Sequence, residues 1–185
     1  MGDETLRILG IDPGSHVTGF GVVERIGAKV HHVAHGTLRP PRAQDLARRL
    51  AFIHQGLSEV VALHAPELAV VEKAFVGSNP RTALALGQAR GAAMAVLGAA
   101  GLTIDELTPG EIKRAVVGTG RAEKRQVQQM VKRLLGLDVE PAEDAADALA
   151  AAICRGHAGR LAGLVRGPRP RSRRARSEYV VRRAR

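Results

Sequence analysis

Four acidic residues stand beside or inside apolar segments of this chain, where a folded protein seldom accepts a charge. Asp12 follows the largely apolar residues 8–11, and Glu72 follows the apolar residues 68–71. Asp144 and Asp147 interrupt an alanine-rich stretch. Because Asp and Glu are rarely buried unless they are paired or bound to a metal, acids from three separate segments predict one acidic pocket. Carboxylate oxygens without nitrogen or sulfur ligands suit Mg²⁺ or Mn²⁺.

An acidic pocket of this kind is suited to phosphodiester hydrolysis. Four carboxylates can hold two divalent ions about 3.5–4 Å apart, one activating a water and the other stabilising the leaving oxygen. No Ser-His-Asp signature offers a protein nucleophile instead. Taken singly, Asp12 also fits an ordinary turn before Pro13, and Asp144 and Asp147 fit a first helical turn, where the dipole favours anions. The joint occurrence of the four acids favours the metal site.

Three other residues have a type that suits a nucleic acid. Lys124 stands near the start of an expected helix, where a cation opposes the dipole, so a phosphate partner would explain it. Lys113 lies on the preceding short helix, and both lysines also fit a solvated helix face. Phe75 follows Glu72 closely in an expected loop. It either fills the core or stacks on an unpaired base.

The elements that must position these residues follow from apolar periodicity and from turn residues. Residues 7–11, 18–25 and 29–38 are predicted to form three strands of an antiparallel meander, and residues 68–72 and 102–107 two further strands. Thr108 and Glu111 have the spacing of a capping box that starts a short helix. Longer helices are predicted at residues 43–64, 82–100, 122–135 and 141–157. This order predicts an α/β fold, with a five-stranded mixed sheet and helices on both faces.

Composition predicts one folded domain and a basic tail. The 185 residues carry a net charge of +10, and residues 166–185 hold nine Arg against the single acid Glu178. We therefore expect a domain at residues 1–166 and a disordered tail at residues 167–185, which serves either solubility or phosphate binding. The single Cys154 indicates a reducing compartment. The acidic N-terminus is not typical of a signal peptide, and Arg90 interrupts the most apolar helix, so we expect a cytoplasmic protein with no membrane span.

Several separated motifs resemble the RuvC family of Holliday-junction resolvases, the crossover junction endodeoxyribonucleases. The resemblance runs from about Arg7 to His157 and is carried by residues 8–21, 70–75, 87–91, 113–124 and 144–150. It implies an RNase H-like fold. It also implies that the four acids form the metal-binding catalytic set, that Lys113 and Lys124 support cleavage, and that Phe75 contacts unpaired DNA. Arg81 and Arg121 are further candidate DNA-binding residues.

The resemblance also implies how such a protein works with its partners. Two copies act as a homodimer, whose surface includes the helix at residues 82–100, with Gly87 and Gly91 permitting close approach. Its two sites make paired nicks in strands of like polarity at a four-way DNA junction and leave 5′-phosphate ends. The implied protein partners are the branch-migration proteins RuvA and RuvB, and the implied place of action is the nucleoid. The Arg-rich tail lies outside the motifs.

The residues alone leave three other functions open. An actin-like ATPase also begins with a strand, an Asp and a glycine-rich turn, although such proteins need a second phosphate loop and a longer chain. A DNA-binding scaffold would use the basic tail but would not require the acids, which weaken DNA binding. A related nuclease acting on structured RNA would share the same acidic pocket, so only its substrate would distinguish it.

Overall fold

The computed structural model describes residues 4–73 and 79–162 as one five-stranded sheet with five helices. The strands are β1 (Thr5–Asp12), β2 (Thr18–Ile26), β3 (Lys29–Leu38), β4 (Leu68–Glu72) and β5 (Thr103–Leu107). The helices are α1 (Leu46–His64), α2 (Pro80–Ala99), α3 (Pro109–Val117), α4 (Lys124–Leu135) and α5 (Glu143–Ala162). The expected boundary between domain and tail at residues 166 and 167 lies outside the described residues and stays a prediction.

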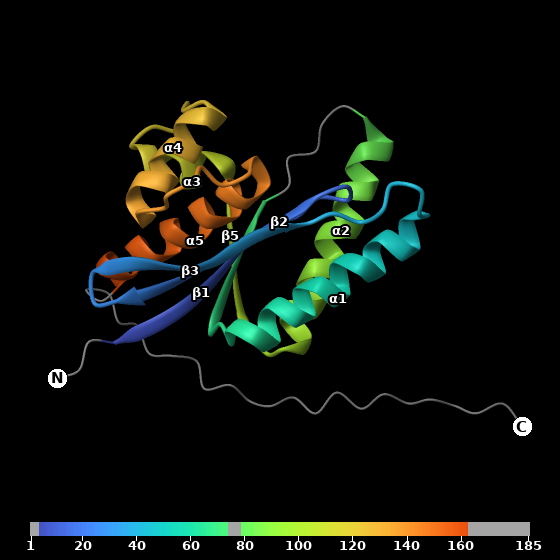
Figure 1. The fold of residues 1–185 in the computed structure, drawn as a ribbon, viewed down its shortest axis with the longest axis horizontal. Coiled ribbons are helices and arrows are strands. Elements are labelled where there is room, and N and C mark those ends of the chain that lie inside the picture. Colours follow the sequence, from blue (N-terminus) through green and yellow to red (C-terminus); the bar gives the residue numbers. More distant parts are fainter. Residues whose placement is uncertain (1–3, 74–78, 163–185) are drawn as a thin grey trace, which may run out of the picture.

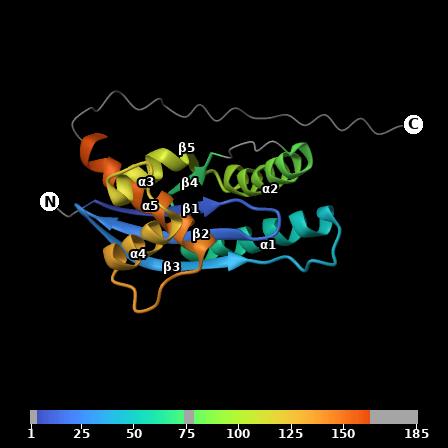
Figure 2. The ribbon, with the colours of Figure 1, turned by 90° about the horizontal axis from the view of Figure 1, so that it is seen from above.

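The sheet has the strand order β3-β2-β1-β4-β5, which Figure 2 shows from above. β1, β2 and β3 pair antiparallel as a meander, whereas β4 and β5 continue the sheet parallel to β1. Parallel neighbours need crossover connections, which α1 and α2 supply. The predicted five-stranded mixed sheet is therefore confirmed.

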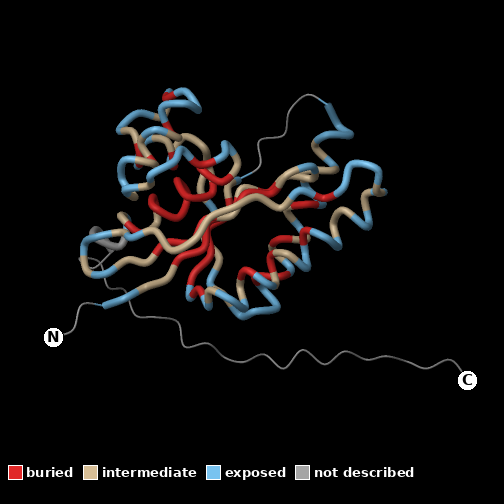
Figure 3. The backbone as a smooth tube through the Cα atoms, in the orientation of Figure 1, coloured by how far each residue is buried: buried red, intermediate tan, exposed pale blue. Residues whose placement is uncertain are grey.

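Helices cover both faces of the sheet, as predicted. α3, α4 and α5 pack on one face, and α1 and α2 pack on the other (Figure 1). The strands β1 and β4 are buried between the two layers, which explains why residues 8–11 and 68–71 are almost entirely apolar. Figure 3 shows the buried backbone running through the centre of the sheet and through α5. None of the helices within residues 4–73 and 79–162 combines the length and apolar character needed to cross a lipid bilayer.

Glycines in β1 and β2 let α5 lie directly on the sheet backbone. A Cβ added at Gly10 would stand 1.9 Å from the carbonyl oxygen of Ala148, and one added at Gly19 would stand 1.9 Å from that of Asp144. The two contacts are one helical turn apart on α5 and two residues apart along β1, since Gly19 pairs with Asp12. This close contact fixes where the first turn of α5, with its two acids, meets the sheet.

Gly10→Ala is expected to destabilise the protein by about 1–3 kcal/mol, because its methyl group would overlap a backbone carbonyl that cannot rotate away. The free energy of unfolding from urea titration measures the effect. Gly98→Ala is the matched control, since open space surrounds this helical glycine and alanine is the better helix former. Equal stability of Gly10→Ala and the wild type would show that α5 does not rest on β1 in this way.

Candidate active site

Asp12 and Glu72 lie side by side because of the register between β1 and β4. These parallel strands pair Ile11 with Val71, and the next residue of each strand is the acid at its carboxyl end. Both acids are half-buried, and the residue before each of them is fully buried. The two acids predicted from separate apolar runs are therefore neighbours at the carboxyl ends of two adjacent strands.

The first turns of α5 bring the other two acids to the same strand ends. A cavity of about 210 Å³ is lined by Asp12, Glu72 and Asp147 together with Lys113, Lys124, Pro109, Ile112 and Val127. Asp144 lies one turn earlier on α5 and does not line this cavity, but its charge acts on Asp12. The structure thus gathers three of the four predicted acids around one cavity and places the fourth at its margin.

The surroundings of these acids oppose their ionisation. Burial, followed by the charges of Glu72, Asp147 and Asp144, raises the pKa of Asp12 to about 7. Burial and the charge of Asp147 likewise raise the pKa of Glu72 to about 7, and burial raises the pKa of Asp147. Three neighbouring carboxylates therefore carry fewer negative charges at neutral pH than they would in water, unless a cation joins them.

Lysines from two helices face the acids. Lys124 opens α4 and Lys113 lies on α3, and both line the cavity and lower the pKa of Glu72. The Nζ atom of Lys124 donates a hydrogen bond to Glu143, and this bond raises the pKa of the lysine. Lys124 therefore remains charged at neutral pH and is held at the edge of the acidic cavity.

Two residues that the sequence analysis did not single out hold the turn after Asp12. Thr18 is a fully buried polar residue. Its hydroxyl group donates a hydrogen bond to the Gly14 carbonyl at 2.8 Å and accepts one from the Gly14 N–H at 3.3 Å. Arg49 on α1 donates from Nε to the Ser15 carbonyl at 3.0 Å. These three hydrogen bonds stiffen the turn that follows Asp12. Thr18 looks like an ordinary strand residue, and Arg49 like an exposed helix residue, so no sequence signal marked them.

The remaining predicted residues are spread more widely. Arg81 is exposed in the first turn of α2, whose N-cap Asn79 accepts from its backbone N–H at 3.0 Å. Arg121 is exposed in the connection that leads to α4. Neither lines the acidic cavity. Phe75 and the basic tail lie outside the described residues.

Comparison with known proteins identifies the family. A family model described as crossover junction endodeoxyribonuclease RuvC matches residues 8–155 of the chain. The protein of that name from Burkholderia vietnamiensis is 52% identical over 180 residues, which cover 97% of this chain and 98% of the relative. The one from Alkalilimnicola ehrlichii is 58% identical over 151 residues, or 82% of this chain and 91% of the relative. The chain belongs to the RuvC family.

The fold of a solved RuvC agrees with this assignment. The Thermus thermophilus RuvC in complex with a Holliday junction substrate superposes with a TM-score of 0.79 at 30% identity, over 85% of this chain and 96% of that one. The predicted RNase H-like fold is thereby confirmed. The matched segment also confirms the span that the sequence motifs indicated, from about Arg7 to His157.

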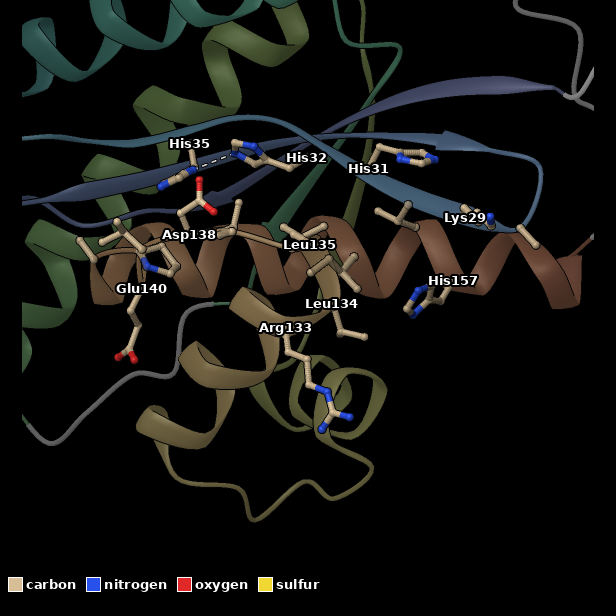
Figure 4. Close-up of a pocket in the computed structure, with 18 residues that line it drawn as sticks. Lys29, His31, His32, His35, Arg133, Leu134, Leu135, Asp138, Glu140 and His157 are labelled. Atoms are coloured by element: carbon tan, nitrogen blue, oxygen red, sulfur yellow. Dashed lines mark hydrogen bonds between the residues drawn. The ribbon is translucent and has the colours of Figure 1, made fainter.

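A second and larger hollow of this RuvC-family chain, among the described residues, lies between β3 and the loop that joins α4 to α5 (Figure 4). It has a volume of about 1050 Å³, and none of the four predicted acids lines it. A register shift in β3 places His32 and His35 together, with Nε2 of the first and Nδ1 of the second 2.8 Å apart. Burial and the neighbouring His35 lower the pKa of His32. Because the acids lie elsewhere, this hollow is not the predicted hydrolytic site.

Proposed function

We propose that this chain resolves four-way DNA junctions by hydrolysing phosphodiester bonds at the cavity lined by Asp12, Glu72 and Asp147, with Asp144 at its margin. The observation that carries the proposal is the convergence of these acids from three separate segments in a chain of the RuvC family. A crossover junction endodeoxyribonuclease of this family makes paired nicks in strands of like polarity and leaves 5′-phosphate ends.

The donor set suits a hard divalent cation. All the acids offer oxygen, and burial together with neighbouring acids raises the pKa of Asp12 and of Glu72 to about 7, so a cation would favour their ionised forms. Within residues 4–73 and 79–162, no three His, Cys, Asp or Glu side chains already surround a single point as a preformed metal site. The acids therefore suit a divalent cation by their oxygen donors and their charge, and not by a preformed geometry. We propose that the four acids hold Mg²⁺ or Mn²⁺, two ions per site, which activate a water and stabilise the leaving oxygen when bound.

The lysines bring positive charge to the DNA side of the cavity. Lys124 is held by Glu143 beside the acids, and its side chain is 64% exposed, so it can reach a phosphate that enters the site. Lys113 lines the same cavity from α3. We assign both lysines to neutralising the phosphate under attack, with Lys124 the more directly placed. Arg81 and Arg121, which do not line the cavity, are assigned to DNA further from the reacting phosphate, and Phe75 is assigned to unpaired DNA.

A second copy of the chain is proposed to pack against α2. Leu84 is 65% exposed on this helix, and no atom stands within 4 Å of a Cβ placed at Gly87 or Gly91. Leu84, Gly87 and Gly91 follow each other at the spacing of one helix face, and small residues there let two helices approach closely. A homodimer provides two sites for the two nicks. RuvA and RuvB remain its proposed protein partners, at the nucleoid of the cytoplasm.

Cleavage of matched substrates tests the proposal. A synthetic four-way junction, a linear duplex of the same sequence and a hairpin RNA are incubated with the protein in Mg²⁺, in Mn²⁺ and in chelator. The junction should be cut at paired positions in either metal, with ends that DNA ligase can join, and should remain intact in chelator. The linear duplex and the hairpin RNA should be cut at least about a hundredfold more slowly, which corresponds to roughly 3 kcal/mol of discrimination. Equal cleavage of the hairpin RNA would favour the RNA nuclease, and cleavage in chelator would remove the metal from the proposal.

A further inference from the structure

An arginine from the end of β3 reaches an acid of the site, whereas the lysines come from helices. Arg39 follows β3, and its Nη2 atom stands 3.9 Å from Oδ2 of Asp144. Its Nε atom donates a hydrogen bond to the Thr37 hydroxyl at 3.2 Å, which aims the side chain along the end of the sheet. The Arg39 side chain is nevertheless 59% exposed, and that of Asp144 is 34% exposed.

The register of the sheet explains how Arg39 reaches the site. Asp12 pairs with Gly19 on β2, and Gly19 pairs with Thr37 on β3, so the three residues form one row across the sheet. Gly19 lies against the backbone carbonyl of Asp144. The first turn of α5 therefore rests on this row, and Arg39 stands at its β3 end, whereas Lys113 and Lys124 come from α3 and α4.

The contact with Asp144 is too weak to account for this placement. An exposed ion pair with its atoms 3.9 Å apart contributes about 0–1 kcal/mol to stability. A guanidinium has five N–H donors in a fixed plane that matches the oxygens of a phosphate. Arg39 uses two of its nitrogens within the protein and remains mostly open to solvent. Its geometry suits a ligand outside the protein that carries negative charge.

We propose that Arg39 binds a backbone phosphate of the junction strand that lies across the acidic site. A strand over Asp12 and Asp147 then meets the positive charge of Lys124 on α4 and, beside Asp144, that of Arg39 after β3. If Asp144 held a cation, Arg39 would exchange this carboxylate for the phosphate as its partner. This inference rests on the proposed nuclease function and adds a residue to its DNA-binding surface.

Junction affinity as a function of salt concentration tests the role of Arg39. The measurement uses a labelled four-way junction and fluorescence anisotropy, with every variant built on Asp12→Asn so that no strand is cut. Arg39→Ala should weaken binding about three- to tenfold and make the slope of log affinity against log salt shallower by about one, since one phosphate contact is lost. Arg39→Lys should keep most of the slope, because it retains the charge.

Arg42→Ala is the matched control, because Arg42 is an exposed arginine three residues further along the same connection. It removes the same charge and should leave the slope unchanged. An unchanged slope for Arg39→Ala, or an equal change for Arg42→Ala, would overturn the inference. Because the readout is binding by a protein that does not cut, a failure here leaves the cleavage assay valid. Absence of junction cleavage by the wild type would count against the proposed nuclease function, and the cleavage assay detects this independently of the binding assay.

Discussion

Asp12→Asn is expected to lower the rate of junction cleavage by at least about a thousandfold and to leave junction binding intact or stronger. Asn has the shape of Asp but lacks its charge, so it replaces one of the carboxylates that we propose to hold the metal. A bound cation contributes several kcal/mol to catalysis, and roughly 4 kcal/mol corresponds to a thousandfold in rate. Binding should survive because the variant removes negative charge from a surface that meets phosphates. Single-turnover cleavage of a labelled junction gives the rate, and anisotropy gives the affinity.

Asp138→Asn provides the control for this experiment. Asp138 is exposed on the loop before α5 and lines the large hollow beside His35, so the same chemical change is made away from the acid cluster. Its cleavage rate should match the wild type. Wild-type cleavage by Asp12→Asn would remove Asp12 from the catalytic set, and a loss of junction affinity of the same size as the loss of rate would assign it to binding.

The placement of Asp12 and Glu72 was predictable because short apolar runs between turn residues have few alternatives to a buried strand. β4 begins and ends where the sequence pattern indicated, and the capping box of Thr108 and Glu111 starts α3 as expected. Small differences concern helix ends. α1 was predicted from residue 43 but starts at Leu46, because the Asp45 side chain caps it by accepting from the N–H of Arg48.

Contacts between distant polar residues were not predictable. Arg49 reaches Ser15, Arg39 reaches Asp144, and the His32–His35 pair depends on a register shift in β3. Each of these side chains is of a type that usually faces water, so nothing in the local pattern distinguishes it from a solvated residue. Only the strand order and the position of α5 decide which of them meet. The four acids could be identified from the sequence because charged residues are unexpected beside apolar segments.

The burial of Asp12 and Glu72 predicts how the stability of the metal-free protein depends on pH. The folded pKa values of Asp12 and Glu72 are about 7, and their ordinary values are 3.8 and 4.5. Between about pH 4 and pH 7 the folded protein therefore holds protons that the unfolded chain releases, so this part of its stability falls as pH rises. In chelator, the melting temperature of the wild type should fall between pH 5 and pH 8 relative to that of the double variant with Asp12→Asn and Glu72→Gln. A wild type that gains stability relative to this variant over the same range would contradict the assignment.

Divalent cations should reverse that loss, and their apparent affinity should rise roughly a hundredfold between pH 6 and pH 8. An acid with a pKa of about 7 is roughly nine-tenths protonated at pH 6 and one-tenth protonated at pH 8, so proton competition at each of Asp12 and Glu72 accounts for about tenfold. Thermal unfolding at increasing Mg²⁺ concentration, at pH 6, 7 and 8, gives the midpoint concentration at each pH. Glu72→Gln removes one competing acid and one cause of the raised pKa of Asp12, so its midpoint should shift clearly less than that of the wild type over the same range, whatever its absolute affinity. Equal midpoints at pH 6 and pH 8 in the wild type would mean that the cation binds without displacing these protons, and therefore binds away from Asp12 and Glu72.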